Sequence, residues 1–313
     1  MTLKVKGLHH FTAICGDPTQ NAKFYVNKLG LRMIKKTVNH DAPEYYHLFY
    51  GDHKGTPGSS ITFFPNMANQ QGKPGAGMIT ELALRIPENS LEYWIAHLED
   101  EQINYQKQEW RGKETLTLQD PDQLQLRLVP QKLQENNFET WSDSTVPEEH
   151  QIQGMHHVKL EIPNPEETAR LLEKMNFEEK EQSGSRENRY FEAEDQSGVE
   201  LEMNHEKGRM GKGSVHHIAF KIETEEEQEK CRDEIIRRGL RPSPMISRKY
   251  FTSFYFREHN GILFEFSSMG PGYTADETVK ELGSSLVLPE KLENRREEIE
   301  QALEEFNEEE INQ

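Results

Sequence analysis

The chain contains only two cysteines in 313 residues, Cys15 and Cys231, and no long hydrophobic run. The two cysteines stand far apart and outside any CxxC spacing, so we expect neither a disulfide framework nor a cysteine-rich metal site. No apolar stretch approaches the ~20 residues of a membrane-spanning helix. Residues 1–7 lack the apolar segment of a secretory signal. These absences predict a cytoplasmic protein with reduced thiols.

Basic residues are also scarce. The chain has 37 Lys and Arg against 55 Asp and Glu, which gives a formal net charge of −18 at pH 7. Nucleic acids and anionic membranes bind through basic patches, so this balance argues against both as partners. A hydrophobic content of 34% and the length of the chain are still sufficient for a folded protein with two domains.

Histidine is distributed unevenly, because three His-His doublets occur in closely similar surroundings. They are His9-His10, His156-His157 and His216-His217. Each doublet follows a Gly or Ser by one residue and opens a short apolar stretch that is typical of a β-strand. Since histidine is a common metal ligand, the repetition indicates a repeated structural unit with a metal ligand on its first strand.

The doublets mark three of four repeats, which start near residues 7, 77, 154 and 214. In each repeat a strand leads into a helix and then into three short strands separated by turn residues. Asp17-Pro18 and Asn164-Pro165 are typical helix starts, and Thr224 with Glu227 forms a capping box. The sequence therefore predicts an α+β fold of four tandem βαβββ modules.

The modules divide the chain into two halves. We predict an N-terminal domain of modules 1 and 2 at residues 1–135, a linker at 136–150, and a C-terminal domain of modules 3 and 4 at 151–270. Residues 271–313 form an acidic tail. Its stretch from Pro289 to Phe306 has apolar residues at helical spacing, which predicts a helix lying over the body. The apolar stripe consists of Leu292, Ile299, Leu303 and Phe306.

Metal ligands can come from the first and last strands of the modules. The first-strand position holds Thr80 in module 2 and histidine in the other three modules. These histidines are His10, His157 and His217. When the last strands are aligned on their turn glycines, only modules 3 and 4 have a carboxylate there, Glu202 and Glu265. Glu265 lies between two phenylalanines on an apolar strand, where an unpaired charge would be costly.

Two histidines and one carboxylate leave further positions of a divalent ion open, as in non-haem Fe(II) oxygenases. The spacing allows His217 and Glu265 to act with either His10 or His157. It also allows a site of His10, His157 and Glu202. Sequence spacing alone leaves these three sets open.

The segment Phe254-Tyr255-Phe-Arg-Glu258-His-Asn-Gly261-Ile-Leu-Phe-Glu265 resembles the signature of extradiol dioxygenases. These enzymes belong to the vicinal oxygen chelate superfamily, which is built from paired βαβββ modules. His259 stands where the signature has proline, and Arg248-Lys249 stand where catechol-cleaving enzymes carry a histidine. Together with the N-terminal His9-His10-Phe-Thr12, these differences make the chain similar to the hydroquinone-type ring-cleaving dioxygenases. The resemblance covers residues 6–268 and implies paired half-barrel sheets.

This resemblance implies Fe(II), or alternatively Mn(II), held by His10, His217 and Glu265. It also implies supporting roles for five neighbouring residues. These are His9, Thr12, His216, Arg248 and Tyr255. Strand alternation would turn His9 and His216 away from the ligands. The implied partners are O₂ and a small aromatic diol, a hydroquinone or a catechol, and a homo-oligomer is compatible with the sequence. Arg248 would stabilise the developing oxyanion, and Tyr255 would hydrogen-bond the substrate oxygen or relay a proton.

Other functions of the same superfamily are alternatives. A glyoxalase-type isomerase needs a second carboxylate ligand, and Thr62 in module 1 argues against it. Thiol transferases of this superfamily are shorter chains. A sequestering protein of the bleomycin-resistance type would bind an aromatic ligand or antibiotic without metal. The complete set of two histidines and one glutamate favours the dioxygenase.

Overall fold

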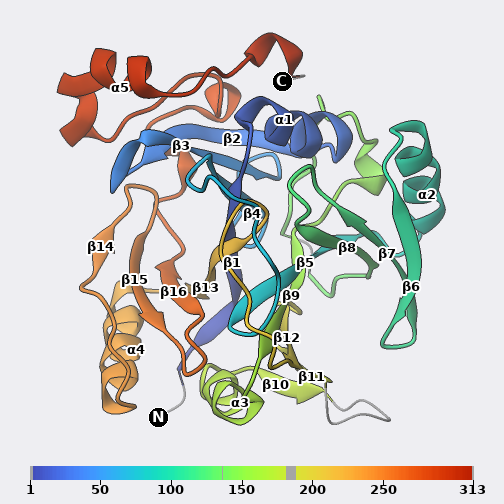
Figure 1. The fold of residues 1–313 in the computed structure, drawn as a ribbon, viewed down its shortest axis with the longest axis vertical. Helices are drawn as coiled ribbons and strands as arrows, with labels where there is room; N and C mark the ends of the chain where they lie inside the picture. Colours follow the sequence, from blue (N-terminus) through green and yellow to red (C-terminus); the bar gives the residue numbers. More distant parts are fainter. Residues whose placement is uncertain (1–2, 136, 181–187, 312–313) are drawn as a thin grey trace.

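The computed structural model describes residues 3–135, 137–180 and 188–311. Within them the chain forms two curled eight-stranded sheets with a few helices around them (Figure 1). The predicted α+β fold of four βαβββ modules in paired sheets is confirmed.

The four modules follow one another along the chain. Module 1 comprises β1 (Val5–Cys15), α1 (Pro18–Ala22) with a π-helical continuation (Lys23–Lys28), β2 (Arg32–Asn39), β3 (Ala42–Gly51) and β4 (Ser60–Pro65). Module 2 comprises β5 (Met78–Ile86), α2 (Leu91–Asp100), β6 (Tyr105–Trp110), β7 (Lys113–Gln119) and β8 (Gln125–Pro130). Module 3 comprises β9 (Met155–Ile162), α3 (Pro165–Lys174), β10 (Glu178–Lys180), β11 (Asn188–Glu192) and β12 (Gly198–Met203). Module 4 comprises β13 (Val215–Ile222), α4 (Glu225–Arg237), β14 (Ile246–Ser247), β15 (Thr252–Arg257) and β16 (Leu263–Ser268).

Helices α1 and α4 begin at the residues that the sequence indicates. The Asp17 carboxylate accepts a hydrogen bond from the backbone N–H of Gln20 at 2.8 Å, and Pro18 occupies the first helical turn. The Thr224 hydroxyl likewise accepts from the N–H of Glu227 at 3.2 Å. Each contact satisfies a backbone donor that has no partner within its helix.

Each sheet combines modules from both halves of the chain. The first sheet has the strand order β14-β15-β16-β13-β1-β4-β3-β2, so it joins module 1 to module 4. The second has the order β10-β11-β12-β9-β5-β8-β7-β6 and joins module 2 to module 3. The sheets therefore do not follow the division into residues 1–135 and 151–270. The first strand of each module lies at the centre of its sheet, consistent with its nearly continuous burial.

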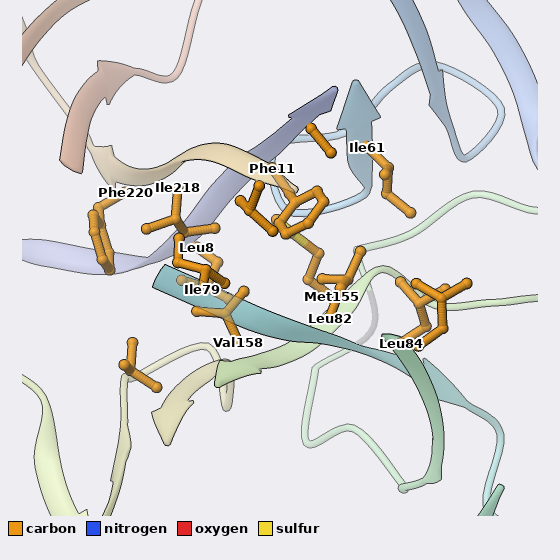
Figure 2. Close-up of a cluster of buried hydrophobic side chains, with 14 of the residues drawn as sticks. Leu8, Phe11, Ile61, Ile79, Leu82, Leu84, Met155, Val158, Ile218 and Phe220 are labelled. Carbon is orange, nitrogen blue, oxygen red and sulfur yellow. The ribbon is translucent and has the colours of Figure 1, made fainter. Parts of the chain in front are cut away.

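The two sheets share one hydrophobic core. Figure 2 shows Leu8 and Phe11 of β1 close to Ile79 and Leu82 of β5, with Val158 of β9 beside them. All five side chains are buried. Because the central strands of both sheets supply this cluster, the sheets pack as one body around it.

The tail beyond module 4 lies over β2 and β3 (Figure 1). Leu292 and Ile299 are buried in a cluster with Val38 of β2. The predicted continuous helix over Pro289–Phe306 is wrong in its extent. Glu290–Arg295 form a 3-10 helix, and only α5 (Arg296–Ala302) is α-helical. Glutamates follow at positions 304 and 305, and negative charge at a helix C-terminus opposes the helix dipole.

Candidate metal centre and substrate pocket

His10, His217 and Glu265 come together on the first sheet. Thr12 of β1 lies opposite His217 of β13, and Glu265 of β16 lies beside Ala219 of β13. The Nε2 atoms of His10 and His217 lie 3.3 Å and 2.9 Å from Glu265 Oε2. All three side chains are buried, and their ligand atoms lie within 4.8 Å of one another. We call these three residues the first centre.

The chemistry of the first centre suits a divalent cation. Glu265 Oε2 is buried and has no hydrogen-bond partner among the residues that the structure describes, although two imidazole nitrogens face it. Burial alone would raise the pKa of the Glu265 carboxyl, but the imidazoles of His10 and His217 hold it well below its usual value. A buried carboxylate needs a compensating positive charge. Two imidazoles and one carboxylate form the facial set that Fe(II) and related ions accept.

The first histidine of each doublet orients the second. His9 Nδ1 lies 2.9 Å from His10 Nδ1, and His9 Nε2 lies 3.1 Å from the carbonyl of Ser268. Because that carbonyl can only accept, His9 carries its proton on Nε2 and accepts from the Nδ1–H of His10. His10 Nε2 therefore carries no proton and faces Glu265. It is the nitrogen that would bind a metal.

His216 has the same relation to His217, with their Nδ1 atoms 2.8 Å apart. Burial and the neighbouring His217 lower the pKa of His216 to about 3, so it is a neutral imidazole at physiological pH. Alternation along a strand suggested that His9 and His216 turn away from the second histidine of each doublet. The structure shows instead that each contacts that histidine directly through Nδ1.

Arg248 and Tyr255 meet beside the first centre. The Arg248 Nε–H donates to the Tyr255 hydroxyl oxygen at 3.1 Å, and the Tyr255 ring lies edge-on to His217, with centroids 5.8 Å apart. Burial and the charge of Glu265 raise the pKa of Tyr255 well above its usual value. Tyr255 therefore keeps its proton, and its oxygen accepts from Arg248.

Thr12 belongs to a chain of hydrogen bonds. Its hydroxyl lies 2.8 Å from that of Thr62, which in turn lies 2.9 Å from His47 Nε2. His47 is packed between the rings of Phe49 and Phe64, with centroids 4.0 and 4.3 Å away. Burial lowers the pKa of His47 well below 6.5, so it is a neutral donor and acceptor.

Sequence reasoning missed His47 because the stretch from Asn39 to His47 could not be placed. It lies on β3, where residues 45, 47 and 49 share one strand face. The aromatic residues at 45 and 49 flank His47 on that face. This alternation is the signal that could have identified it.

A pocket of about 340 Å³ opens onto the first centre. Its polar lining includes His47, His216, Arg248 and Tyr255 as well as His10 and His217. Its apolar walls come from Phe49, Phe64, Phe251 and Leu263. The volume and the aromatic walls suit a small ring compound with polar substituents.

His157 lies elsewhere, on the second sheet. Its Nε2 faces Glu81 and Glu200 at 3.8 and 3.5 Å. The alternative metal sets that include His157 are therefore not assembled. The carboxylate that corresponds to Glu265 is Glu200, not Glu202. Glu200 lies beside Lys159, two residues after His157, just as Glu265 lies beside Ala219, two residues after His217. Glu202 pairs with Lys159 at 3.2 Å and is partly exposed.

Thr80 is also not the counterpart of His10. Both β1 and β5 have irregularities in their pairing. Glu81 lies opposite Lys159 on β9 as His10 lies opposite Ala219 on β13, so Glu81 is the counterpart of His10. A shift of one residue moves a side chain to the other face of a sheet. Module 2 therefore has an ionisable residue, Glu81, at the first-strand position where the sequence alignment predicted Thr80.

Among the described residues, no helix is both long and apolar enough to cross a membrane.

The fold and the site agree with the comparison with known proteins. The chain belongs to the Glyoxalase/Bleomycin resistance protein/Dioxygenase superfamily, which matches residues 7–128 and 154–266. The relative named "Putative ring-cleaving dioxygenase MhqO" from Bacillus subtilis (strain 168) is 37% identical over 305 residues, which cover 97% of each chain. Chlorohydroquinone/hydroquinone 1,2-dioxygenase from Sphingobium indicum is 30% identical over 309 residues, which cover 95% of each chain.

Solved structures show the same relationship. The crystal structure of a protein described as a "putative dioxygenase" from Bacillus subtilis matches with a TM-score of 0.91 and 35% identity, over 97% of this chain and 98% of that one. Glyoxalase I from Zea mays shares the fold at a TM-score of 0.59 and 15% identity, over 88% of this chain and 95% of that one. The predicted superfamily and the similarity to ring-cleaving dioxygenases are confirmed.

Proposed function

We propose that the protein is a non-haem Fe(II)-dependent ring-cleaving dioxygenase that acts on a hydroquinone or a catechol with O₂. The observation that carries the proposal is the buried, unpartnered oxygen of Glu265 facing the Nε2 atoms of His10 and His217. When bound there, Fe(II) supplies Lewis acidity for an aromatic hydroxyl and redox capacity toward O₂. The two relatives named as ring-cleaving and hydroquinone dioxygenases support this reaction class.

The pocket residues have distinct tasks in this proposal. Phe49, Phe64 and Phe251 hold the ring of the substrate between apolar walls and limit the access of water. The fixed positive charge of Arg248 favours an ionised substrate oxygen and stabilises negative charge that develops during cleavage. Tyr255 holds a proton on its hydroxyl beside the same space and donates it to a substrate oxygen.

His47 recognises a polar group of the substrate. Its Nε2 contacts the Thr62 hydroxyl, and within the described residues Nδ1 makes no hydrogen bond, so Nδ1 is the nitrogen that can meet the substrate. A neutral imidazole at this place offers one directed hydrogen bond without adding charge. This matches an aromatic diol, whose two hydroxyls need partners at different places on the pocket wall.

The test is oxygen consumption by the protein reconstituted anaerobically with Fe(II). Added hydroquinones or catechols should be consumed together with O₂ in equal amounts, and both atoms of ¹⁸O₂ should appear in the ring-opened product. A protein that binds Fe(II) but consumes no O₂ with any of these compounds would contradict the proposal. If metal-free protein bound aromatic ligands as tightly as the metal-loaded protein, a sequestering function would be favoured instead.

A further inference from the structure

The second sheet contains a partial copy of the first centre. Tyr190 lies opposite Glu200 on β11 and β12, as Tyr255 lies opposite Glu265 on β15 and β16. The rings of His157 and Tyr190 are 5.8 Å apart at 81°, against 5.8 Å and 86° for His217 and Tyr255. Module 3 has therefore kept the geometry of module 4.

The copy extends to the orientation of the histidine. His156 Nδ1 lies 2.8 Å from His157 Nδ1, as in the doublet of module 4. His157 Nε2 consequently points away from His156. This nitrogen is fully buried and makes no hydrogen bond within residues 3–135, 137–180 and 188–311. It faces the carboxylates of Glu81 and Glu200, and we call these three residues the second centre.

The residues that distinguish the second centre from the first come from module 2. Glu81 lies opposite Lys159 as His10 lies opposite Ala219, so Glu81 takes the place of His10. By the same register, Arg127 beside Ala83 takes the place of Thr62 beside Thr12. The second centre therefore has one carboxylate more than the first, together with a fixed cation.

The Arg127 guanidinium is bound tightly at this place. Its Nε and Nη2 donate to the two oxygens of Glu81 at 2.7 and 3.0 Å, and its Nη1 donates to the Thr115 hydroxyl at 3.0 Å. Trp110 closes the centre from another side. Its ring stacks on His157 with centroids 4.5 Å apart, and its Nε1–H donates to Glu200 at 3.1 Å.

We infer that the second centre is a masked metal site, in which the guanidinium of Arg127 takes the place of a divalent cation. The buried Glu81 carboxylate requires positive charge, and Arg127 supplies it permanently, while Glu200 accepts from Trp110 and faces His157. Two carboxylates and one imidazole are ligands that Mn²⁺, Fe²⁺ and Zn²⁺ all accept. The first sheet thus depends on an exchangeable ion, whereas the second sheet carries its own cation.

The test is the substitution Arg127→Thr, which installs the residue found at this place in the first centre. After removal of metal with chelator, equilibrium dialysis against Mn²⁺ should show one more ion per chain in R127T than in the wild type. The difference is counted against the wild type, so it does not depend on what the first centre holds or catalyses. The matched control R127T/E200Q should lose the additional ion.

A second variant guards against misfolding caused by the unpaired Glu81. The variant E81H/R127T reproduces the histidine and threonine of module 1 and leaves Glu200 as the single carboxylate. It should bind the additional ion, and Mn²⁺ should raise its Tm more than that of E81H/R127T/E200Q. Folded variants without an additional ion would overturn the inference. Failure of both variants to fold with Mn²⁺ present would also overturn it, because the metal would then not replace the guanidinium.

Discussion

The Nε2 atoms of His10 and His217 lie 3.4 Å apart, although the residues are 207 positions apart in the sequence. Both nitrogens face the same oxygen of Glu265. Two imidazoles and a carboxylate converge in this way where a cation binds between them. The pairing of β1 with β13 brings the two histidines together, so the centre depends on contact between the first and the last module.

Removal of any one of the three residues of the first centre should abolish metal binding. We expect His10→Ala and Glu265→Gln to retain the fold but lose bound Fe(II) and O₂ consumption, because two ligands cannot hold the ion against solvent. Metal content measured by mass spectrometry would check this. His157→Ala is the matched control, since His157 lies on the other sheet, and it should keep its metal. Loss of metal in H157A alone would contradict the assignment.

His9 should tune the affinity for metal. In His9→Phe the ring of His10 loses its Nδ1 acceptor, and loss of such a supporting contact typically costs about 10- to 100-fold in metal affinity or activity. Titration of the metal-free protein with Fe(II) under nitrogen would measure it. His156→Phe is the equivalent change on the second sheet and should leave the affinity unchanged. Equal effects of both substitutions would point to a general packing defect.

Tyr255→Phe should lower kcat by about 10²-fold or more, the usual contribution of a positioned proton donor. Because the pKa of Tyr255 is raised, its hydroxyl stays protonated through pH 10, and the rate of the wild type should show no alkaline loss from this group. A pH–rate profile of both proteins would check this. Tyr190→Phe, at the equivalent place on the second sheet, should be nearly neutral for kcat. A fall in activity of the wild type between pH 8 and 10 that is absent in Y255F would refute the assignment.

The two cysteines should be unreactive in the native protein. Both are buried, and burial raises the pKa of Cys231 to about 12 and that of Cys15 well above its usual value. A raised pKa leaves almost no thiolate at pH 8, and the thiolate is the reactive form. A chromogenic disulfide reagent at pH 8 should therefore label neither thiol before unfolding and both after it. Rapid labelling of either thiol in the native protein would contradict the described packing.

Lys35→Met should loosen the tail. Lys35 is fully buried and its ammonium group pairs with Asp276 and Glu277, which follow module 4. Asp276 keeps Lys249 at 2.6 Å, whereas the Glu277 carboxylate loses its cation, so we expect a loss of about 1–3 kcal/mol for the unsatisfied group. Urea denaturation would measure the change, and limited proteolysis would show whether residues after 270 become accessible. The exposed pair of Lys54 and Glu139 offers the control, and Lys54→Met should change stability by about 1 kcal/mol or less.

Much of the architecture could be predicted from the sequence because its signals are local. Helix caps, turn residues and strand alternation recur at matched places in the four modules, and the structure has the elements there. Glu265 could be singled out because an acidic residue between two phenylalanines must be buried with a partner. These features depend only on neighbours along the chain.

The rest depended on contacts between distant strands. Sequence spacing left His10 and His157 as equal partners for His217, because nothing local determines that module 4 pairs with module 1. Alignment on turn glycines selected Glu202, whereas strand register selects Glu200, because Gly198 is already the first paired residue of β12, whereas Gly261 lies in the turn before β16. The register of β5 likewise shows that Glu81, and not Thr80, is the counterpart of His10.

The nested pairing of modules has a consequence for the order of assembly during synthesis. Modules 2 and 3 are neighbours in the sequence, so the second sheet closes a short loop and all of its strands are synthesised before β13. The first sheet can be completed only after its final strand, β16, has been synthesised, because it combines strands of the first and the last module. Assembly of the first centre is therefore a late event, because a nascent chain that ends before β13 carries His10 but neither His217 nor Glu265.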